Sequence, residues 1–463
     1  AASDVYKRQI HAFLLQKELF RSPEPVKTSV VSSFTDTPAL QQIARQADSD
    51  YILFYTGTSP IELHPYAIGR MYQIAESNDG ALFYSDYQEI RQGKKIHHPT
   101  LEYQTGSIRN DFDFGQLLLF RNDSFQQVVA QMNTDYRFAA LYELRLSISR
   151  LGKIVHIPET LYTVQPTDLR LSGEKQFDYV DPANREVQLE MEAVCTAHLQ
   201  AIGAWLAPEF QRIDFGQENF AREASVIIPV RNRKRTIAEA VESALQQQTD
   251  FSFNVIVVDN HSTDGTGQIL TELSRRYPNL IHHIPASTEL GIGGCWTEAI
   301  LLPECGKFAI QLDSDDLYKD CHVLQRIVDT FYQENCAMVI GSYQMVDFKL
   351  EEIPPGLIAH REWTPDNGRN NALRINGLGA PRAFYTPVLR QIKFPNVSYG
   401  EDYATALAIS RKYPIARIYD PLYLCRRWEE NSDHDLDIQQ LNNYNFYKDK
   451  IRTLEIQARI SGK

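Results

Sequence analysis

Three carboxylates crowd one short stretch of the chain. Residues 312–316 read Leu-Asp-Ser-Asp-Asp, and the acids directly follow an apolar run at residues 308–312 that is typical of a buried strand. Asp313 and Asp315, separated by one position, can hold Mg²⁺ or Mn²⁺ through oxygen ligands and leave coordination positions open for the oxygens of a diphosphate. The alternative is a turn in which one acid caps a helix that begins near Tyr318. These five residues alone do not decide between the two interpretations.

The elements that must position these acids lie upstream. A strand is predicted over residues 224–230, a helix over 236–246, a strand over 254–258 and a helix over 267–276. Strands and helices alternating at this spacing predict a mostly parallel sheet, in which ligands gather beyond the carboxyl ends of the strands. Arg231, Asn232, Asp259 and Asp313 all follow such strand ends, so we expect them at one edge of the sheet.

The chain contains an internal repeat. Residues 50–55, 81–84, 115–120 and 149–162 resemble residues 307–312, 337–340, 379–384 and 410–423, in the same order and at offsets of 257, 256, 264 and 261. Two unrelated α/β units would not give four ordered blocks at nearly constant offset. We therefore predict two copies of one fold in tandem.

The first copy keeps the apolar pattern and lacks the acids. Thr56 and Thr58 stand opposite Asp313 and Asp315, and residues 140–141, Ala-Leu, stand opposite the later acidic pair Glu401-Asp402. Any activity is therefore expected in the second copy. The first copy is also shorter, because 84 residues separate Ala224 from Phe308 whereas only 50 residues precede Tyr51. Either residues are missing before the first copy, or its nucleotide-binding half was never complete.

The predicted fold class is α/β, with a mostly parallel, mixed sheet flanked by helices and present as a tandem pair whose first copy is incomplete. The predicted segments are a degenerate, incomplete unit at 10–165, a helical connector and linker at 166–221 with its helix near 181–206, a complete unit at 222–435, and a C-terminal helical tail at 436–463. We expect the tail to pack outside the second unit.

Composition excludes several classes of function. The formal charge of −12 and the pI near 5.5 argue against nucleic acid as a partner, because binding a phosphate backbone needs a positive surface. No apolar run approaches the roughly 18 to 20 residues that span a bilayer, so a cytoplasmic protein is expected, with peripheral association at the inner face of the membrane allowed. The six cysteines show no paired spacing, which argues against a zinc site or a disulfide framework.

Four motifs together give the chain a recognisable signature. Residues 227–232 (Ile-Ile-Pro-Val-Arg-Asn), residues 257–266 (beginning Val-Val-Asp-Asn), residues 312–316 and residues 400–402 (Gly-Glu-Asp) appear in that order. In this combination the chain resembles the family 2 glycosyltransferases of GT-A fold, strongly over residues 224–430 and weakly over 45–165. The resemblance implies a nucleotide-sugar donor, with a UDP-sugar favoured, a divalent metal (Mn²⁺ or Mg²⁺) and inversion at the sugar carbon.

The resemblance also assigns roles by position. Pro229, Val230, Arg231, Asn232 and Asp259 would line the nucleoside pocket, Asp313, Ser314 and Asp315 would lie at the ribose and the metal, and Asp402 beside Glu401 would be the catalytic base. These roles suit inverting transfer, which needs a carboxylate to take the proton of the acceptor hydroxyl and a cation to neutralise the departing diphosphate. Further candidates are Arg427 for phosphate, Trp428 for stacking on a sugar, and His434 as a third metal ligand.

Several of these residues have structural alternatives. Residues 400–402 could cap a helix predicted over 403–411, because acids are favoured in a first turn. Arg427 could simply lie over a packed Trp428, and Arg231, where the family usually has an aromatic residue, could meet the diphosphate or face solvent. Cys295-Trp296 follow the glycines at 291–294 where the family commonly has Arg-Asn, which leaves any phosphate contact there in doubt.

The sequence therefore favours an inverting glycosyltransferase that moves a sugar to a hydroxyl of a saccharide or lipid-linked acceptor, in the synthesis of cell-surface polysaccharide. One alternative is a non-catalytic sugar-binding or scaffold protein. The intact acids of the second copy argue against this alternative. A sugar nucleotidyltransferase is disfavoured, because the segment after Val230 lacks the glycine-rich loop that such an enzyme would need.

Overall fold

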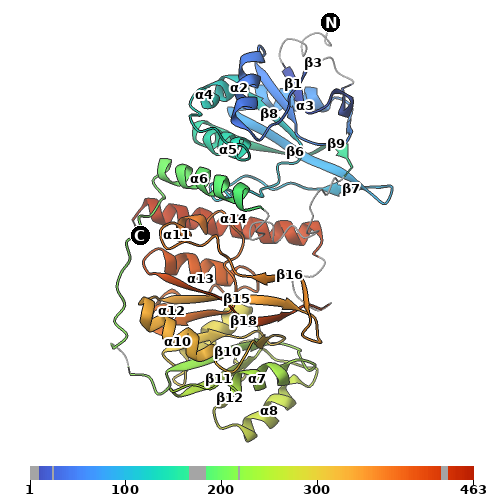
Figure 1. Ribbon diagram of the computed structural model, residues 1–463. Helices are drawn as coiled ribbons and strands as arrows, with labels where there is room; N and C mark the ends of the chain where they lie inside the picture. Colours follow the sequence, from blue (N-terminus) through green and yellow to red (C-terminus); the bar gives the residue numbers. More distant parts are fainter. Residues whose placement is uncertain (1–9, 23–25, 166–183, 217–218, 429–435, 463) are drawn as a thin grey trace. The chain divides into compact units, whose positions relative to one another are not determined.

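The protein folds into two compact units, each built on its own sheet (Figure 1). The structure, a computed structural model, describes residues 10–22, 26–165, 184–216, 219–428 and 436–462. The first unit comprises residues 1–205 together with 436–463, and the second comprises residues 206–435.

The first unit contains a nine-stranded mixed sheet with the order β2-β5-β9-β6-β8-β4-β1-β3, in which β7 pairs with β6. Its strands are β1 (Ile10–Leu14), β2 (Phe20–Arg21), β3 (Lys27–Val30), β4 (Tyr51–Tyr55), β5 (Ile61–Leu63), β6 (Gly80–Arg91), β7 (Lys94–His98), β8 (Leu117–Arg121) and β9 (Lys153–Val164). Its helices are the 3₁₀ turn η2 (Lys17–Leu19), α2 (Thr37–Gln46), α3 (Ala67–Glu76), α4 (Asn122–Val129), α5 (Ala140–Leu151), α6 (Arg185–Ala201) and α14 (Ile438–Ile460).

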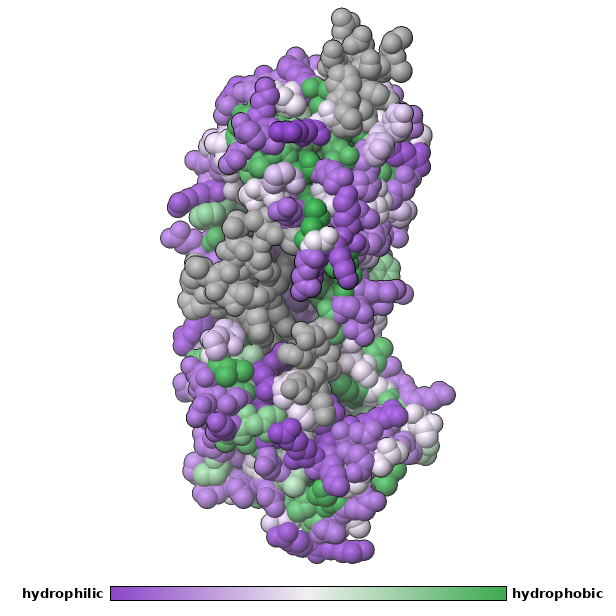
Figure 2. Space-filling model, turned by 90° about the vertical axis from the view of Figure 1, so that its right-hand side faces the viewer, coloured by the Kyte–Doolittle hydropathy of each residue, from purple (hydrophilic) through white to green (hydrophobic). Residues whose placement is uncertain are grey.

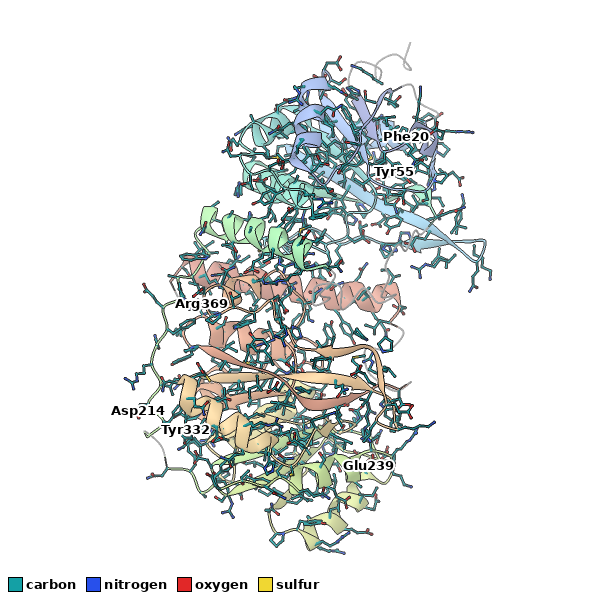
Figure 3. All side chains as sticks on the ribbon, in the orientation of Figure 1. Phe20, Tyr55, Asp214, Glu239, Tyr332 and Arg369 are labelled. Carbon is teal, nitrogen blue, oxygen red and sulfur yellow. The ribbon has the colours of Figure 1, made fainter. Side chains whose placement is uncertain are left out.

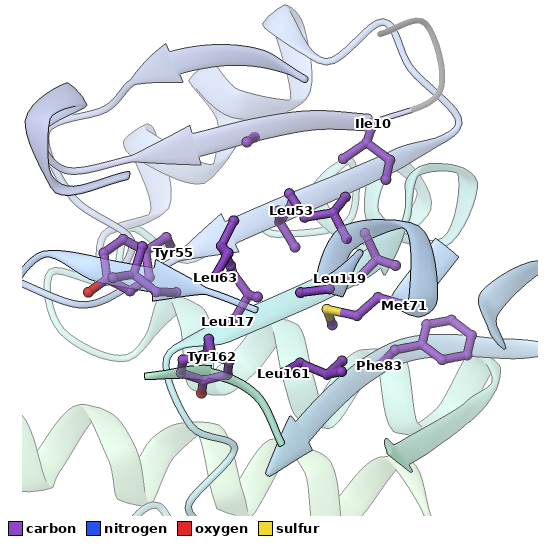
Figure 4. Packing of buried hydrophobic residues seen from close by; sticks show 14 of the residues in the cluster. Ile10, Leu53, Tyr55, Leu63, Met71, Phe83, Leu117, Leu119, Leu161 and Tyr162 are labelled. Atoms are coloured by element: carbon purple, nitrogen blue, oxygen red, sulfur yellow. The ribbon is translucent and has the colours of Figure 1, made fainter. Parts of the chain in front are cut away.

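The central strand β4 is buried on both faces, as its continuous apolar run requires. Alternate side chains point to opposite sides: Leu53 joins a cluster with residues of α3, and Phe54 joins a second cluster with residues of α2, α4 and α5. Figure 4 shows part of the first cluster, including Leu53, Leu119 of β8 and Met71 of α3. The sheet of the first unit is thus sandwiched between α3 and the set of α2, α4 and α5.

The second unit also contains a nine-stranded mixed sheet, with the order β12-β11-β10-β13-β17-β15-β18-β14 and with β16 paired to β15. Its strands are β10 (Ala224–Val230), β11 (Phe253–Asp259), β12 (Leu280–His283), β13 (Phe308–Gln311), β14 (Leu317–Tyr318), β15 (Met338–Val346), β16 (Glu352–Ile358), β17 (Arg382–Tyr385) and β18 (Ile415–Arg426). Its helices are α7 (Ile237–Leu245), α8 (Thr266–Arg276), α9 (Ile292–Leu301), α10 (Val323–Glu334), α11 (Gly368–Asn371), α12 (Thr386–Ile392) and α13 (Glu401–Ser410).

The two sheets are copies of one topology, which confirms the predicted tandem α/β fold. Read from β3 and from β11, seven consecutive strands correspond one to one, and every pair of neighbours has the same parallel or antiparallel sense in both units. The register agrees as well: Ile52 pairs with Phe120 as Ala309 pairs with Phe384. Because this register reproduces the offsets of 257 and 264, the two units can be compared position by position.

The first copy is short in the segments between its leading strands. The strand that corresponds to β10 is β1, and Ile10 lies 41 residues before Tyr51, whereas Ala224 lies 84 residues before Phe308. Within the described residues, no helix like α7 joins β1 to β3, and only α2 lies between β3 and β4, where the second unit has α8, β12 and α9. Both leading strands are present, so the shortfall lies in the segments that join them.

The C-terminal helix packs on the first unit, so the expectation that it would pack outside the second unit is wrong. The buried carboxylate of Asp449 in α14 accepts hydrogen bonds from Ser107 Oγ at 3.0 Å, from Arg109 Nε at 3.2 Å and from Arg452 Nη1 at 2.8 Å. This position could not be predicted from local pattern, because Ser107 and Arg109 lie more than 300 residues upstream of Asp449.

None of the described helices is long and apolar enough to cross a membrane. On the face that Figure 2 shows, hydrophilic residues predominate and apolar residues occur in small groups.

Candidate active site

The residues predicted for the site lie at and just beyond the carboxyl ends of β10, β11 and β13. Asn232, just after β10, has φ 55°, a left-handed conformation that Asn tolerates better than most residues. Its backbone N–H donates to Ser262 Oγ at 2.9 Å, and its side-chain Oδ1 accepts from the N–H of Thr263 at 2.8 Å. The loops after β10 and β11 are therefore held together through Asn232.

Asp259 ends β11 and is buried. Its carboxylate accepts a hydrogen bond from the N–H of Ser262 at 2.9 Å and lies 3.3 Å from His282 Nε2. Burial opposes ionisation, but the hydrogen bonds from His282 and Ser262 outweigh it and lower the pKa of Asp259. Asp259 is therefore a fixed acceptor at the position predicted for the nucleoside.

The capping alternative for the acids after β13 is wrong. Residues Leu317–Tyr318 form the strand β14, and the next helix, α10, begins only at Val323 with His322 as its N-cap. Asp316 holds two strand ends together. Its buried carboxylate accepts the N–H of Arg426 at 2.8 Å, and in the first unit the corresponding Ser59 makes the corresponding link by donating to the carbonyl of Gln165 at 2.9 Å.

Asp315 is held among aromatic and cationic side chains. Trp428 Nε1 donates to its Oδ2 at 3.1 Å, and Arg233 Nε lies 3.8 Å from the same oxygen. The guanidinium groups of Arg233 and Arg235 lie 5.7 and 5.5 Å from the Trp428 ring centroid, and Phe348 meets that ring edge-on. The guanidinium groups of Arg233 and Arg235 therefore both lie over the Trp428 ring.

The acid pair has the chemistry of a divalent-cation site. Burial and the neighbouring charge of Asp313 raise the pKa of Asp315, which is the unfavourable arrangement that a bound cation relieves. The described residues contain no group of three side chains able to hold a metal ion. Asp313 and Asp315 fit a metal that takes its remaining oxygen ligands from a diphosphate and water. His434, the predicted third ligand, lies outside the described residues.

A chain of hydrogen bonds leads from Asp313 to Asp402. Gln311 Nε2 donates to both carboxylate oxygens of Asp313, at 2.9 and 3.0 Å, and Gln311 Oε1 accepts from the backbone N–H and the Nε of Arg382, at 3.1 and 2.9 Å. Arg382 Nη1 in turn forms an ion pair with Asp402 Oδ2. Two side chains therefore join the predicted metal ligand to the predicted base.

Asp402 stands in the first turn of α13, which begins at Glu401 after Gly400 with φ 80°. The predicted helix is present, so Glu401 and Asp402 do occupy a helix N-terminus. The glycines at 291–294 serve this same region. A Cβ on Gly293 would lie 2.0 Å from the carbonyl oxygen of Pro395, so only glycine lets α9 approach the loop that leads into Glu401. The glycines thus permit close packing against the loop at residues 395–397.

The remaining predicted residues lie around this edge. Val230 and Ser314 are buried, Pro229 is partly buried, and Arg231 is exposed. The backbone N–H of Arg427 donates to the carbonyl of Val346 at 2.9 Å. Sequence reasoning missed Gln311, Arg382 and Arg233. Gln311 could have been noticed as a polar residue in an otherwise apolar strand. Nothing in the sequence marked Arg382, because its partners depend on the register between strands.

Comparisons with known proteins match a family profile to part of the second unit. The profile of Glycosyl transferase family 2 matches residues 225–392. A poly(ribitol-phosphate) beta-glucosyltransferase of Bacillus spizizenii is 24% identical over 230 residues, which are 48% of this chain and 35% of that protein. A putative teichuronic acid biosynthesis glycosyltransferase, TuaG of Bacillus subtilis, is 26% identical over 195 residues, 42% of this chain and 74% of that protein.

Among solved structures, residues 1–349 of S. aureus TarS in complex with UDP-GlcNAc match 51% of this chain and 72% of that chain, at 23% identity and a TM-score of 0.40. This chain spans about a third of the length of the Bacillus spizizenii relative. The profile match covers the strands β10, β11, β13 and β17 and the acids after β13. Residues 225–392, within the second unit, are therefore a family 2 glycosyltransferase domain.

Proposed function

We propose that the second unit is an inverting, metal-dependent glycosyltransferase. It moves a sugar from a nucleotide-diphosphate sugar, a UDP-sugar first among the candidates, to a hydroxyl of a saccharide or lipid-linked acceptor. The observation that carries the proposal is the hydrogen-bonded path from Asp313 through Gln311 and Arg382 to Asp402. It joins a carboxylate suited to the diphosphate end of a donor to a carboxylate suited to an acceptor.

In the proposed reaction, the bond between the sugar C1 and the diphosphate oxygen breaks, and its electron pair leaves with the nucleoside diphosphate. The acceptor oxygen forms the new bond to C1 from the opposite face, while its proton passes to the Asp402 carboxylate. Asp313 and Asp315 would hold the metal, which supplies positive charge for the departing diphosphate. Asp259 would bind the nucleoside.

The biological setting is proposed from the relatives. The two Bacillus proteins bear names that refer to poly(ribitol-phosphate) and to teichuronic acid. We infer that this chain likewise acts in the synthesis of a cell-surface polymer, with a polymeric or lipid-linked acceptor at the inner face of the membrane. The first unit, which lacks the acids, is proposed to stabilise the second or to position a long acceptor.

The test is a panel of UDP-sugars incubated with the full chain and Mn²⁺, with release of UDP as the readout. Turnover is expected with at least one donor, and none after the metal is chelated. Asp402→Asn should reduce transfer to a small residual rate while UDP with Mn²⁺ binds with its affinity unchanged. Binding of UDP without any turnover by the unmodified chain would favour the scaffold alternative, and absence of Mn²⁺-enhanced UDP binding would refute the proposed site.

A further inference from the structure

We propose that Gln311 and Arg382 are positioning residues of the transfer reaction, which tie the diphosphate-binding carboxylate Asp313 to the base Asp402. Arg382 holds Oδ2 of Asp402, and Oδ1 is left to face the acceptor hydroxyl. The inference rests on the proposed function of this site.

The residue types are those that such a link requires. A carboxylate only accepts hydrogen bonds and a guanidinium only donates them, so a residue between Asp313 and Arg382 must donate on one side and accept on the other. The amide of Gln311 does both: its Nε2 serves Asp313 and its Oε1 serves Arg382. Gln311 is buried, so loss of a hydrogen-bond partner at either of its polar side-chain atoms would lower the free energy of unfolding.

Asp402 is held from one side only. Its side chain is 28% exposed, and Arg382 is its ion-pair partner through Oδ2. Among the residues that the structure describes, none forms a hydrogen bond with Asp402 Oδ1. One oxygen is therefore fixed by a rigid, planar cation while the other remains available to accept a proton.

The first unit provides an internal control. By register and helix start, Gln311, Arg382 and Asp402 correspond to Phe54, Leu118 and Leu141. Phe54 and Leu118 pair across β4 and β8 within one hydrophobic cluster, and Leu141 packs against that same cluster. The fold thus fills these three positions with apolar side chains where no reaction is needed.

In the same comparison, Tyr423 is a residue that both copies keep. Tyr423, whose hydroxyl accepts the N–H of Asp313 at 2.9 Å, corresponds to Tyr162, whose hydroxyl accepts the N–H of Gln116 at 2.8 Å. The tyrosine is present in both units, although it braces a residue just after β13 in the second unit and the residue before β8 in the first, whereas the polar path is present only beside the acids. If Gln311 and Arg382 served stability alone, the first unit could have kept them after losing the counterparts of Asp313 and Asp402. It has apolar residues at both positions instead.

The test compares Arg382→Leu, the residue of the first unit, with Arg382→Lys and with Arg390→Leu as a matched control. Arg390 lies in the same unit, and its Nε donates to the carbonyl of Ile300 at 2.7 Å. Arg382→Leu is expected to lower kcat by about a hundredfold, as misplacement of a reacting group does. The affinity for UDP with Mn²⁺ should change by less than threefold. Arg390→Leu should lower the thermal midpoint and leave the pH profile unchanged.

The pH profile separates positioning from stability. A neighbouring cation lowers the pKa of a carboxyl, so Arg382→Leu should move the acidic limb of kcat/KM to higher pH by about one unit or more. Arg382→Lys keeps the charge and should keep the limb in place while recovering part of kcat. Gln311→Leu, which cuts the path at its centre, should lower both kcat and the affinity for UDP with Mn²⁺.

A double-mutant cycle decides the mechanism. If Arg382 acts through Asp402, then adding Arg382→Leu to Asp402→Asn should reduce the residual rate by less than threefold. An additive loss, or an acidic limb that stays in place in Arg382→Leu, would overturn this inference and leave the proposed function standing. No turnover by the unmodified chain with any donor would refute both.

Discussion

Asp449 is predicted to anchor the C-terminal helix to the first unit. Its side chain is 1% exposed, and those of its partners Arg109 and Arg452 are 3% and 0% exposed. Asp449→Ala leaves two buried guanidinium groups without that carboxylate and deprives Ser107 Oγ of its acceptor. Breaking a buried ion pair by removing one partner costs about 3 to 5 kcal/mol, because the remaining charge stays desolvated. We expect the free energy of unfolding of the first unit to fall by that amount.

The assay is chemical denaturation of the full chain, in which two units with separate cores are expected to unfold in separate steps. The matched control is Asp437→Ala, which removes the carboxylate that caps α14 by accepting the N–H of Gln440 at 2.7 Å. Loss of a helix cap costs about 1 kcal/mol. If Asp449→Ala cost no more than the cap, or destabilised the second unit instead, the reasoning from burial would be refuted. Binding of UDP with Mn²⁺ should be the same in both variants.

Three further predictions concern charge and packing. Burial opposes the charge of His98, but Asp113 and Glu89 outweigh it and raise its pKa to about 9, so the stability it contributes is complete below its ordinary pKa near 6.5 and is lost as the pH rises through 9. Denaturation of the first unit between pH 6 and pH 9.5 should show this loss, and His98→Gln should remove it. Asp315→Asn should weaken Mn²⁺-dependent UDP binding by at least about tenfold, measured by calorimetry, while binding without metal stays unchanged. Gly293→Ala should lower kcat, because its Cβ would displace the loop before Glu401, whereas the same change at the exposed Gly203 should leave kcat unaltered.

Much of the second unit could be predicted because its strands are short, apolar and bounded by polar turns. The strand at 224–230 was placed to the residue, and the helix and strand that follow were placed to within one residue. Asn232, Asp259 and Asp313 were predicted to lie at one edge of the sheet, and all three lie at strand ends. Local pattern sufficed there because each of these residues is positioned by the strand immediately before it.

The connections between distant strands could not be predicted in the same way. The contact between Gln311 and Arg382 depends on the antiparallel register of β13 and β17, which sequence spacing does not give. Likewise, the buried position of Asp449 depends on a helix that returns to the first unit after the second is complete. Gln311 could be recognised in the sequence as a polar residue in an apolar strand, and Asp449 as an acid in a predicted helix. The partners of both residues could not be recognised.

The repeat also distinguishes an acid whose structural link is kept in both copies from the acids proposed to take part in the reaction. Asp316 has a counterpart, Ser59, that keeps the same link between strand ends with a neutral hydroxyl, so a polar group is needed at that position in both units. Asp313 and Asp402 have the counterparts Thr56 and Leu141, and Leu141 packs into an apolar cluster. A buried or half-buried carboxylate costs desolvation free energy, which a structural role must offset in either copy. The first copy folds with apolar residues at the positions of Gln311, Arg382 and Asp402, so the fold itself does not require the polar path, and this supports the proposed role of the path in the reaction.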